Sequence, residues 1–109
     1  MSIVSDTEVE RAIRYLEQTD IEVADWKVAV MRAEHMVDVT ESTVYQASSG
    51  SIEDRKRLAK ASPEVMVKQE ELFRAVREHE IIRAKRKRAE LMVEMWRTLS
   101  ANRRQGNIT

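Results

Sequence analysis

The sequence predicts an all-α fold, a long antiparallel coiled-coil helical hairpin with a short helix at its corner, from three observations. Only two Gly and one Pro occur among 109 residues, whereas nineteen acidic and nineteen basic residues give the charge density typical of long helices. Apolar residues recur at heptad spacing, and no long stretch alternates at the period of a strand. The length leaves room for one domain, residues 1–109.

The first long helix is expected over residues 6–48. Ser5 suits the N-cap position, and Glu8, three residues later, completes a capping box. Gly50, in a serine-rich stretch, suits the left-handed position that ends a helix. Between these limits the a and d heptad positions form a regular seam of mostly apolar or small residues: Val9, Ala12, Leu16, Thr19, Val23, Trp26, Val30, Ala33, Val37, Thr40, Val44 and Ala47.

A short helix at the corner is expected over residues 52–61, with Ser51 as its N-cap. The second long helix is expected over residues 63–102, because Ser62 can cap it and Pro63 fits its first position. Residues 103–109 then form a flexible polar tail. The seam of this last helix runs through Val65, Leu72, Ala75, Val76, Ile82, Ala89, Val93 and Trp96.

The two long helices are similar in length, so nearly the whole chain can pair as a hairpin with its helix ends adjacent at the corner. In that register Arg86, which occupies a seam position, lies opposite Asp25 and Trp26. It is expected to pair with Glu22 or Asp25 while it stacks on Trp26. A polar residue in a seam often fixes the register, and we assign that role to Arg86.

A second apolar stripe on each long helix predicts a homo-oligomer. A lone two-helix hairpin has a thin core, because surface dominates in small elongated folds. Apolar positions on two faces indicate that a helix packs on both sides. The residues expected at the oligomer interface are Ile21, Ala24, Val28, Met31, Phe73, Ile81, Leu91, Met95 and Leu99.

The sequence contains no recognisable catalytic or cofactor motif. It lacks a phosphate-cradling glycine loop, a nucleophile elbow and a pair of histidines at metal spacing. Glu34, His35 and Asp38 share a helical face, but a single imidazole is better interpreted as part of a solvated surface than as a metal site. Cysteine is absent, no apolar run reaches the roughly 20 residues that span a bilayer, and the N-terminus does not resemble a signal peptide. We therefore expect a cytoplasmic, non-enzymatic protein without cofactor, metal or membrane contact.

The zero net charge conceals a division between the two halves. Residues 1–48 hold ten acidic and four basic residues, whereas residues 49–109 hold nine acidic and fifteen basic ones. Such asymmetry indicates either a segment that faces nucleic acid or an acidic helix that pairs with a basic one. Exposed aromatic residues are scarce, so nucleic-acid binding would be directed at phosphates, blind to sequence and sensitive to salt. The candidate phosphate-binding residues are Arg55, Lys56, Arg57, Lys60, Arg83, Lys85, Lys87, Arg88, Arg97, Arg103 and Arg104.

The corner resembles the UvsY-type recombination mediators of T-even phages. The resemblance rests on Tyr45 before Ser49-Gly50, then Asp54-Arg55, then Ser62 and Val65, between two long helices. The stretches Lys87-Arg88-Ala89-Glu90-Leu91, Trp96-Arg97-Thr98 and Asn102-Arg103-Arg104 are similar to small phage proteins of the recombination region. By position, the corner residues that match are Arg55, Lys56 and Arg57, while the basic run at 83–88 is nominated on charge alone. The chain departs from that family in its net neutrality, its regular heptads and its shorter length.

This resemblance implies an oligomeric helical protein of the host-cell cytoplasm that binds single-stranded DNA. Such a protein helps to load a recombinase by displacing single-strand-binding protein, holds no nucleotide and catalyses nothing. The other hypothesis is a structural or adaptor coiled coil that binds another protein, for example a phage assembly or inhibitor protein. In that case Arg86 and its neighbours should be engaged by acidic residues of the first helix, Glu22, Asp25 and Glu34.

Overall fold

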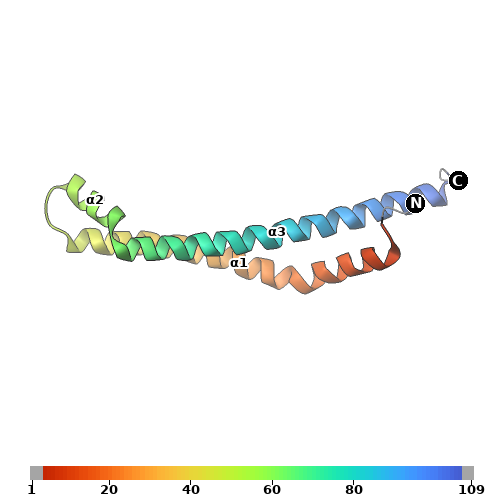
Figure 1. Ribbon diagram of the computed structural model, residues 1–109, viewed down its shortest axis with the longest axis horizontal. Coiled ribbons are helices and arrows are strands. Elements are labelled where there is room, and N and C mark those ends of the chain that lie inside the picture. Colours follow the sequence, from red (N-terminus) through yellow and green to blue (C-terminus); the bar gives the residue numbers. More distant parts are fainter. Residues whose placement is uncertain (1–3, 107–109) are drawn as a thin grey trace. The chain divides into compact units, whose positions relative to one another are not determined.

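The computed structural model describes residues 4–106, which form three α-helices in the order α1 (Asp6–Ala47), α2 (Ile52–Ala61) and α3 (Pro63–Arg104) (Figure 1). The all-α fold class is confirmed. The one boundary that differs by more than a residue is the end of α3, which continues past Asn102. Arg103 and Arg104, expected in the flexible tail, are helical because backbone hydrogen bonds such as Gln105 N to Ala101 O continue the last turn. In the rest of that expected tail, residues 105 and 106 form a turn, and residues 107–109 lie outside the described residues.

The described chain divides into two compact units. The first combines residues up to Val23 with the chain from Ile81 onward, and the second is Ala24–Glu80. In each unit a segment of α1 packs against an antiparallel segment of α3 (Figure 1). The structure thus shows two long helices packed against each other, with each unit holding its own part of the buried seam.

The buried residues of each unit confirm that the heptad seam is the packed face. The buried side chains of the first unit that lie on the two long helices are Val9, Ala12, Thr19, Ile82 and Ala89. Those of the second unit include Val37, Val65 and Ala75, together with Ala59 of α2. Every one of these residues on α1 and α3 occupies a position expected in the seam. The hydrophobic free energy of packing is therefore concentrated on the face that the heptad pattern predicts.

Side-chain caps fix where the helices start. The hydroxyl of Ser5 accepts a hydrogen bond from the Glu8 backbone N–H at 3.1 Å, and that of Ser51 accepts one from Asp54 N–H at 3.1 Å. Ser62 Oγ accepts from Val65 N–H at 3.3 Å while it donates to Ala59 O at 2.9 Å, so this hydroxyl joins the end of α2 to the start of α3. Each cap satisfies backbone groups that have no partner within their own helix.

Arg55 of α2 closes the corner of the second unit onto the end of α1. Its Nε and Nη2 donate to the Tyr45 carbonyl oxygen at 3.3 and 3.1 Å, and its guanidinium carbon lies 4.2 Å from the centroid of the Tyr45 ring. The Tyr45 carbonyl also accepts a hydrogen bond from the Ser48 N–H at 3.2 Å, so Arg55 adds a cation at the negative end of the helix dipole, where positive charge is favourable. Gly50, with a φ of 114°, provides the reversal that brings α2 back along α1.

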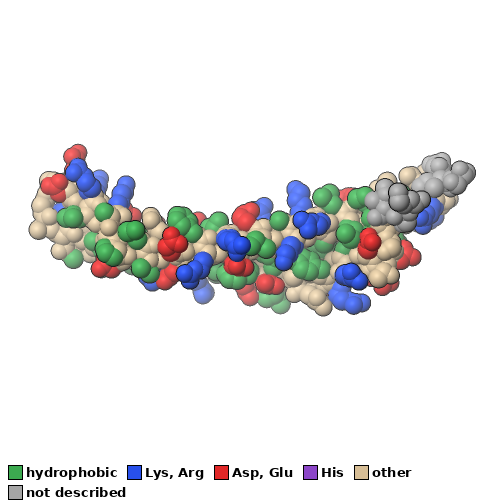
Figure 2. Space-filling model, in the orientation of Figure 1, with side chains coloured by type: hydrophobic (Ala, Val, Ile, Leu, Met, Phe, Trp, Pro, Cys, Tyr) green, Lys and Arg blue, Asp and Glu red, His purple; other side chains and the backbone are tan. Residues whose placement is uncertain are grey.

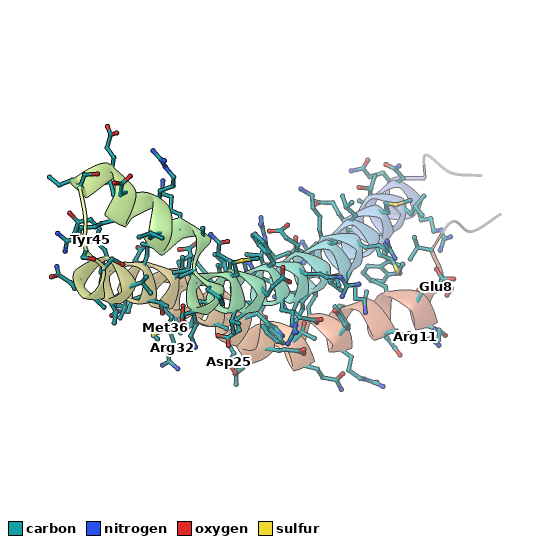
Figure 3. All side chains as sticks on the ribbon, turned by 60° about the vertical axis from the view of Figure 1, so that its left-hand side comes forward. Glu8, Arg11, Asp25, Arg32, Met36 and Tyr45 are labelled. Carbon is teal, nitrogen blue, oxygen red and sulfur yellow. The ribbon has the colours of Figure 1, made fainter. Side chains whose placement is uncertain are left out.

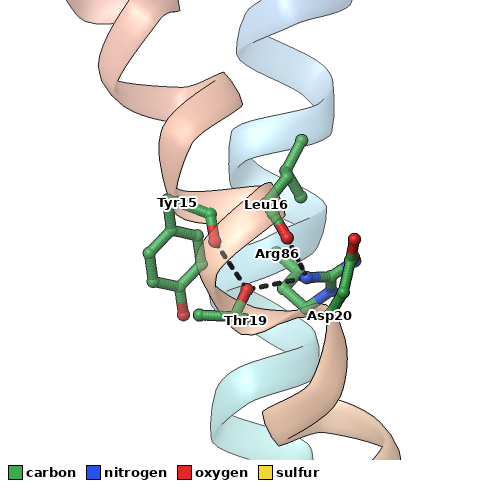
Figure 4. Close-up of polar contacts among 5 residues, drawn as sticks. All are labelled: Tyr15, Leu16, Thr19, Asp20 and Arg86. Carbon is green, nitrogen blue, oxygen red and sulfur yellow. Dashed lines mark hydrogen bonds and ion pairs between the residues drawn. The ribbon is translucent and has the colours of Figure 1, made fainter.

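The structure corrects the expected register. Arg86 does not meet Glu22, Asp25 or Trp26; its Nη1 donates to Leu16 O at 2.8 Å and to Thr19 Oγ1 at 2.7 Å (Figure 4). Its Nη2 forms an ion pair with Asp20 at 2.7 Å. Within the first unit the Trp96 indole N–H likewise donates to Asp6 Oδ1, so α3 residues of this unit meet an earlier turn of α1 than expected.

Candidate nucleic-acid interface

Most of the basic residues of the first unit lie on α3 beside its seam; Arg11 and Arg14 lie on α1. Successive residues of a helix are about 100° apart, so when Ile82 and Ala89 face α1, the cations between them spread over the flanks and outer face of α3. Seven cations of this segment are exposed, and Figure 2 shows Lys and Arg side chains that reach solvent on one face of the molecule. We call them the α3 cations: Arg83, Lys85, Lys87, Arg88, Arg97, Arg103 and Arg104.

Almost all of the α3 cations are unpaired. Within residues 4–106, six of them take part in no ion pair; the exception is Arg83, which has an interaction partner. Arg86 is the cation of the same run that the fold engages: its side chain is 16% exposed, and it binds Asp20 and the α1 backbone. The acidic helix therefore holds Arg86 but leaves its basic neighbours open to solvent. The charge of the six unpaired cations is therefore not neutralised by carboxylates of the protein.

An open groove of about 350 Å³ lies between α1 and α3 in the first unit. Its floor is formed by the two small seam residues Ala12 and Ala89, with Met92 beside them. Since alanine fills little of the space between two helices, a hollow forms where two alanines meet. The groove's α1 side carries Tyr15 and two charged residues near the start of the helix, Glu8 and Arg11, which are labelled in Figure 3. Its α3 side carries Lys85 and Arg88.

This groove brings together residues that sequence reasoning placed apart. Lys85 and Arg88 belong to the predicted phosphate-binding set, and the structure places them beside Arg11 of the acidic helix. Arg11 was missed because the local charge of α1 is negative and the expected register was wrong. The sequence does indicate that Arg11 and Tyr15 lie side by side, because they are four residues apart and therefore on the same helical face.

The corner cations of the second unit are in a different environment. Arg55, half-buried, is engaged by Tyr45 and has a structural role at the end of α1. Lys56, Arg57 and Lys60 are exposed. Lys56 lines a hollow that it shares with the carboxylates of Asp38 and Glu41, which reduce the positive potential there. The corner therefore offers fewer uncompensated cations than α3.

Tyr45 and Trp96, the aromatic residues that accompany the predicted basic clusters in the sequence, are used by the fold. Trp96 is half-buried, and its indole N–H donates to Asp6 Oδ1 at 2.8 Å, which ties α3 to the first turn of α1. Tyr45 is covered on one face by the guanidinium of Arg55. Tyr15, which the sequence did not single out, is half-buried and lines the groove. It shares that groove with two of the α3 cations, Lys85 and Arg88.

The second apolar stripe is largely exposed. The most exposed of its large side chains are Ile21, with 76% of its surface accessible, and Met31 and Phe73, with 59% each. Ala24, Val28, Leu91 and Met95 are also exposed, whereas Ile81 and Leu99 are half-buried. In Figure 2 apolar side chains reach the surface between charged ones. Large apolar side chains at these spacings mark a surface that can bury area against a partner.

Other kinds of site find no support among residues 4–106. No group of three or more acidic or histidine side chains is placed to hold a metal ion. None of the described helices combines the length and the apolar character that crossing a membrane requires. Comparison of the chain with protein-family models, curated proteins and solved structures found no match.

Proposed function

We propose that this chain is a non-enzymatic, sequence-nonspecific single-stranded DNA-binding accessory protein of phage recombination or replication, of the recombinase-loading type. The observation that carries the proposal is the contrast within residues 83–88: Arg86 is engaged by Asp20, whereas Lys85, Lys87 and Arg88 are exposed and unpaired. A basic run that existed only to pair with the acidic helix would direct more than one of its cations toward α1. The loading role and the phage setting rest on the resemblance of the corner to recombination mediators.

The α3 cations suit a flexible, polyanionic strand better than a compact ligand. They are spread over several faces along more than 20 residues of helix. The acidic residues among them are Glu90 and Glu94. A single strand can bend to follow such a surface, and each neutralised phosphate releases condensed counterions. Contacts to phosphates carry no sequence information, so we expect recognition to be electrostatic and independent of sequence.

The exposed stripe supports a homo-oligomer as the working form. Ile21, Met31 and Phe73 expose more than half of their surface, and burying such side chains against a second copy is favourable by roughly 25 cal/mol per Å². An oligomer would also repeat the α3 cations along one bound strand. Repetition raises the overall affinity through effective concentration, without any new kind of contact.

A second candidate function, a structural or adaptor coiled coil, is favoured by the same stripe. Exposed Phe73, Leu91 and Met95 could bind an apolar face of another protein, such as a phage assembly or inhibitor protein. This function gives no role to the unpaired α3 cations. A measurement of nucleic-acid binding therefore separates the two candidates.

We expect a labelled single-stranded oligonucleotide to bind the chain at low salt, measured by fluorescence anisotropy. If six unpaired cations each contact a phosphate, the affinity should fall roughly 300-fold between 50 and 200 mM salt. Oligomer mass, measured on the same samples, should exceed that of the monomer. A folded oligomer that binds no oligonucleotide at low salt would overturn the DNA-binding function in favour of the adaptor, and a monomer at all concentrations would refute the oligomer.

A further inference from the structure

We infer that the groove between Ala12 and Ala89 receives a nucleobase of the bound strand while Lys85 and Arg88 hold phosphates on either side of that base. The inference rests on the proposed function and makes it more specific. Electrostatic binding alone treats the strand as a chain of phosphates. A base in the groove would add a contact that depends on the base itself and that fixes where the strand crosses the first unit.

The shape and lining of the groove fit a flat, weakly polar group. Its floor is apolar, with Ala12 and Ala89 buried and Met92 half-buried, and it is open along one side. Tyr15 brings an aromatic ring to the α1 side, and every nucleobase has a π-face that can stack on such a ring. The volume of about 350 Å³ lies near the lower end of the roughly 300–1,000 Å³ typical of small-ligand sites.

The charges around the groove select an anionic ligand. Arg11, Lys85 and Arg88 surround it with three positive charges, against one negative charge from Glu8. All four charged side chains are exposed, so they can move to meet a ligand without breaking a buried contact. An apolar side chain from a second copy could fill the floor, but it would leave the three cations without partners. A nucleotide supplies both the flat ring and the flanking phosphates.

The test compares two strands of equal length and equal phosphate number, one with bases and one fully abasic. We expect the intact strand to bind the full-length protein about tenfold more tightly than the abasic strand at the same low salt. Ala89→Leu fills the groove and should bring this ratio close to one, while the abasic strand still binds. Ala47→Leu adds the same group at an exposed position in the other unit and should preserve the ratio.

A second variant keeps the test valid if Ala89→Leu misfolds, because a leucine in the buried seam could disturb packing. Tyr15→Leu removes the ring from the side of the groove and should also reduce the ratio; helical circular dichroism confirms that each variant is folded. Equal affinity of the wild-type protein for both strands would overturn the inference. An unchanged ratio in folded Ala89→Leu and Tyr15→Leu would do the same, and a change of oligomer mass in Ala89→Leu would then assign the groove to a second copy. Failure of both strands to bind would instead refute the proposed function itself.

Discussion

The triple charge reversal Lys85→Glu, Lys87→Glu and Arg88→Glu is expected to weaken binding of single-stranded DNA at low salt by at least a hundredfold. The change removes three of the six unpaired α3 cations and introduces three carboxylates that repel phosphates. The number of phosphate contacts sets the salt dependence, so the slope of log affinity against log salt should become correspondingly shallower. Fluorescence anisotropy over a salt series measures both quantities.

The matched control for this variant applies the same total charge change elsewhere. Lys27, Arg32 and Arg74 are exposed cations of the second unit, and their replacement by glutamate alters the net charge of the protein by the same amount. We expect the factor by which this control weakens binding to be less than a tenth of the factor measured for the α3 variant. Equal losses would mean that net charge alone, rather than the α3 cations, governs binding.

Ile82→Ala is expected to cause the largest loss of stability among simple truncations. Ile82 is 5% exposed in the seam of the first unit, and removing a buried aliphatic side chain of this size costs roughly 2–5 kcal/mol. A chain of this length has a total free energy of unfolding on the order of 5–15 kcal/mol, so the loss is a large fraction of it.

Urea unfolding followed by helical circular dichroism, at one fixed protein concentration, measures the effect of Ile82→Ala. The matched control is Ile52→Ala, since Ile52 is 62% exposed at the start of α2 and its truncation should change stability by about 0.5 kcal/mol or less. Similar losses for the two variants would contradict the assignment of the heptad seam as the core.

Local signals were enough to predict the elements of this fold. The hydroxyls of Ser5, Ser51 and Ser62 make the capping hydrogen bonds that their positions in the sequence indicate. The spacing of the seam residues identified the buried face, because a heptad repeat keeps one face of a helix toward its partner. These properties depend on residues less than one or two turns apart, so they can be read along the chain.

The register could not be predicted from the same pattern. A regular heptad seam looks alike after every shift of seven residues, so it does not specify which turns of α1 and α3 meet. In the first unit the register is set by contacts between the two helices, of which the ion pair of Arg86 with Asp20 is one. That contact joins residues on different helices, and nothing in the spacing of either helix indicates it. The expected pairing of Arg86 with Asp25 was wrong for this reason.

The candidate site was predicted in part. Charge density pointed to the basic segment of α3, and the structure places its cations at the surface except Arg86, which occupies a seam position. The groove was not predicted, since it exists only where Ala12 meets Ala89 and where Arg11 comes beside Lys85 and Arg88. Arg55 was predicted to bind phosphate, but the structure shows it engaged in closing the corner.

The most direct measurement of the central claim, that α3 holds the nucleic acid, is a lysine footprint with and without saturating single-stranded DNA. Acetylation of the folded protein, read out by mass spectrometry, reports the exposure of each lysine separately. We predict that DNA protects Lys85 and Lys87, whereas Lys27, exposed on α1 in the second unit, reacts at an unchanged rate. Equal modification of Lys85 and Lys87 in the free and the DNA-bound protein would contradict the account.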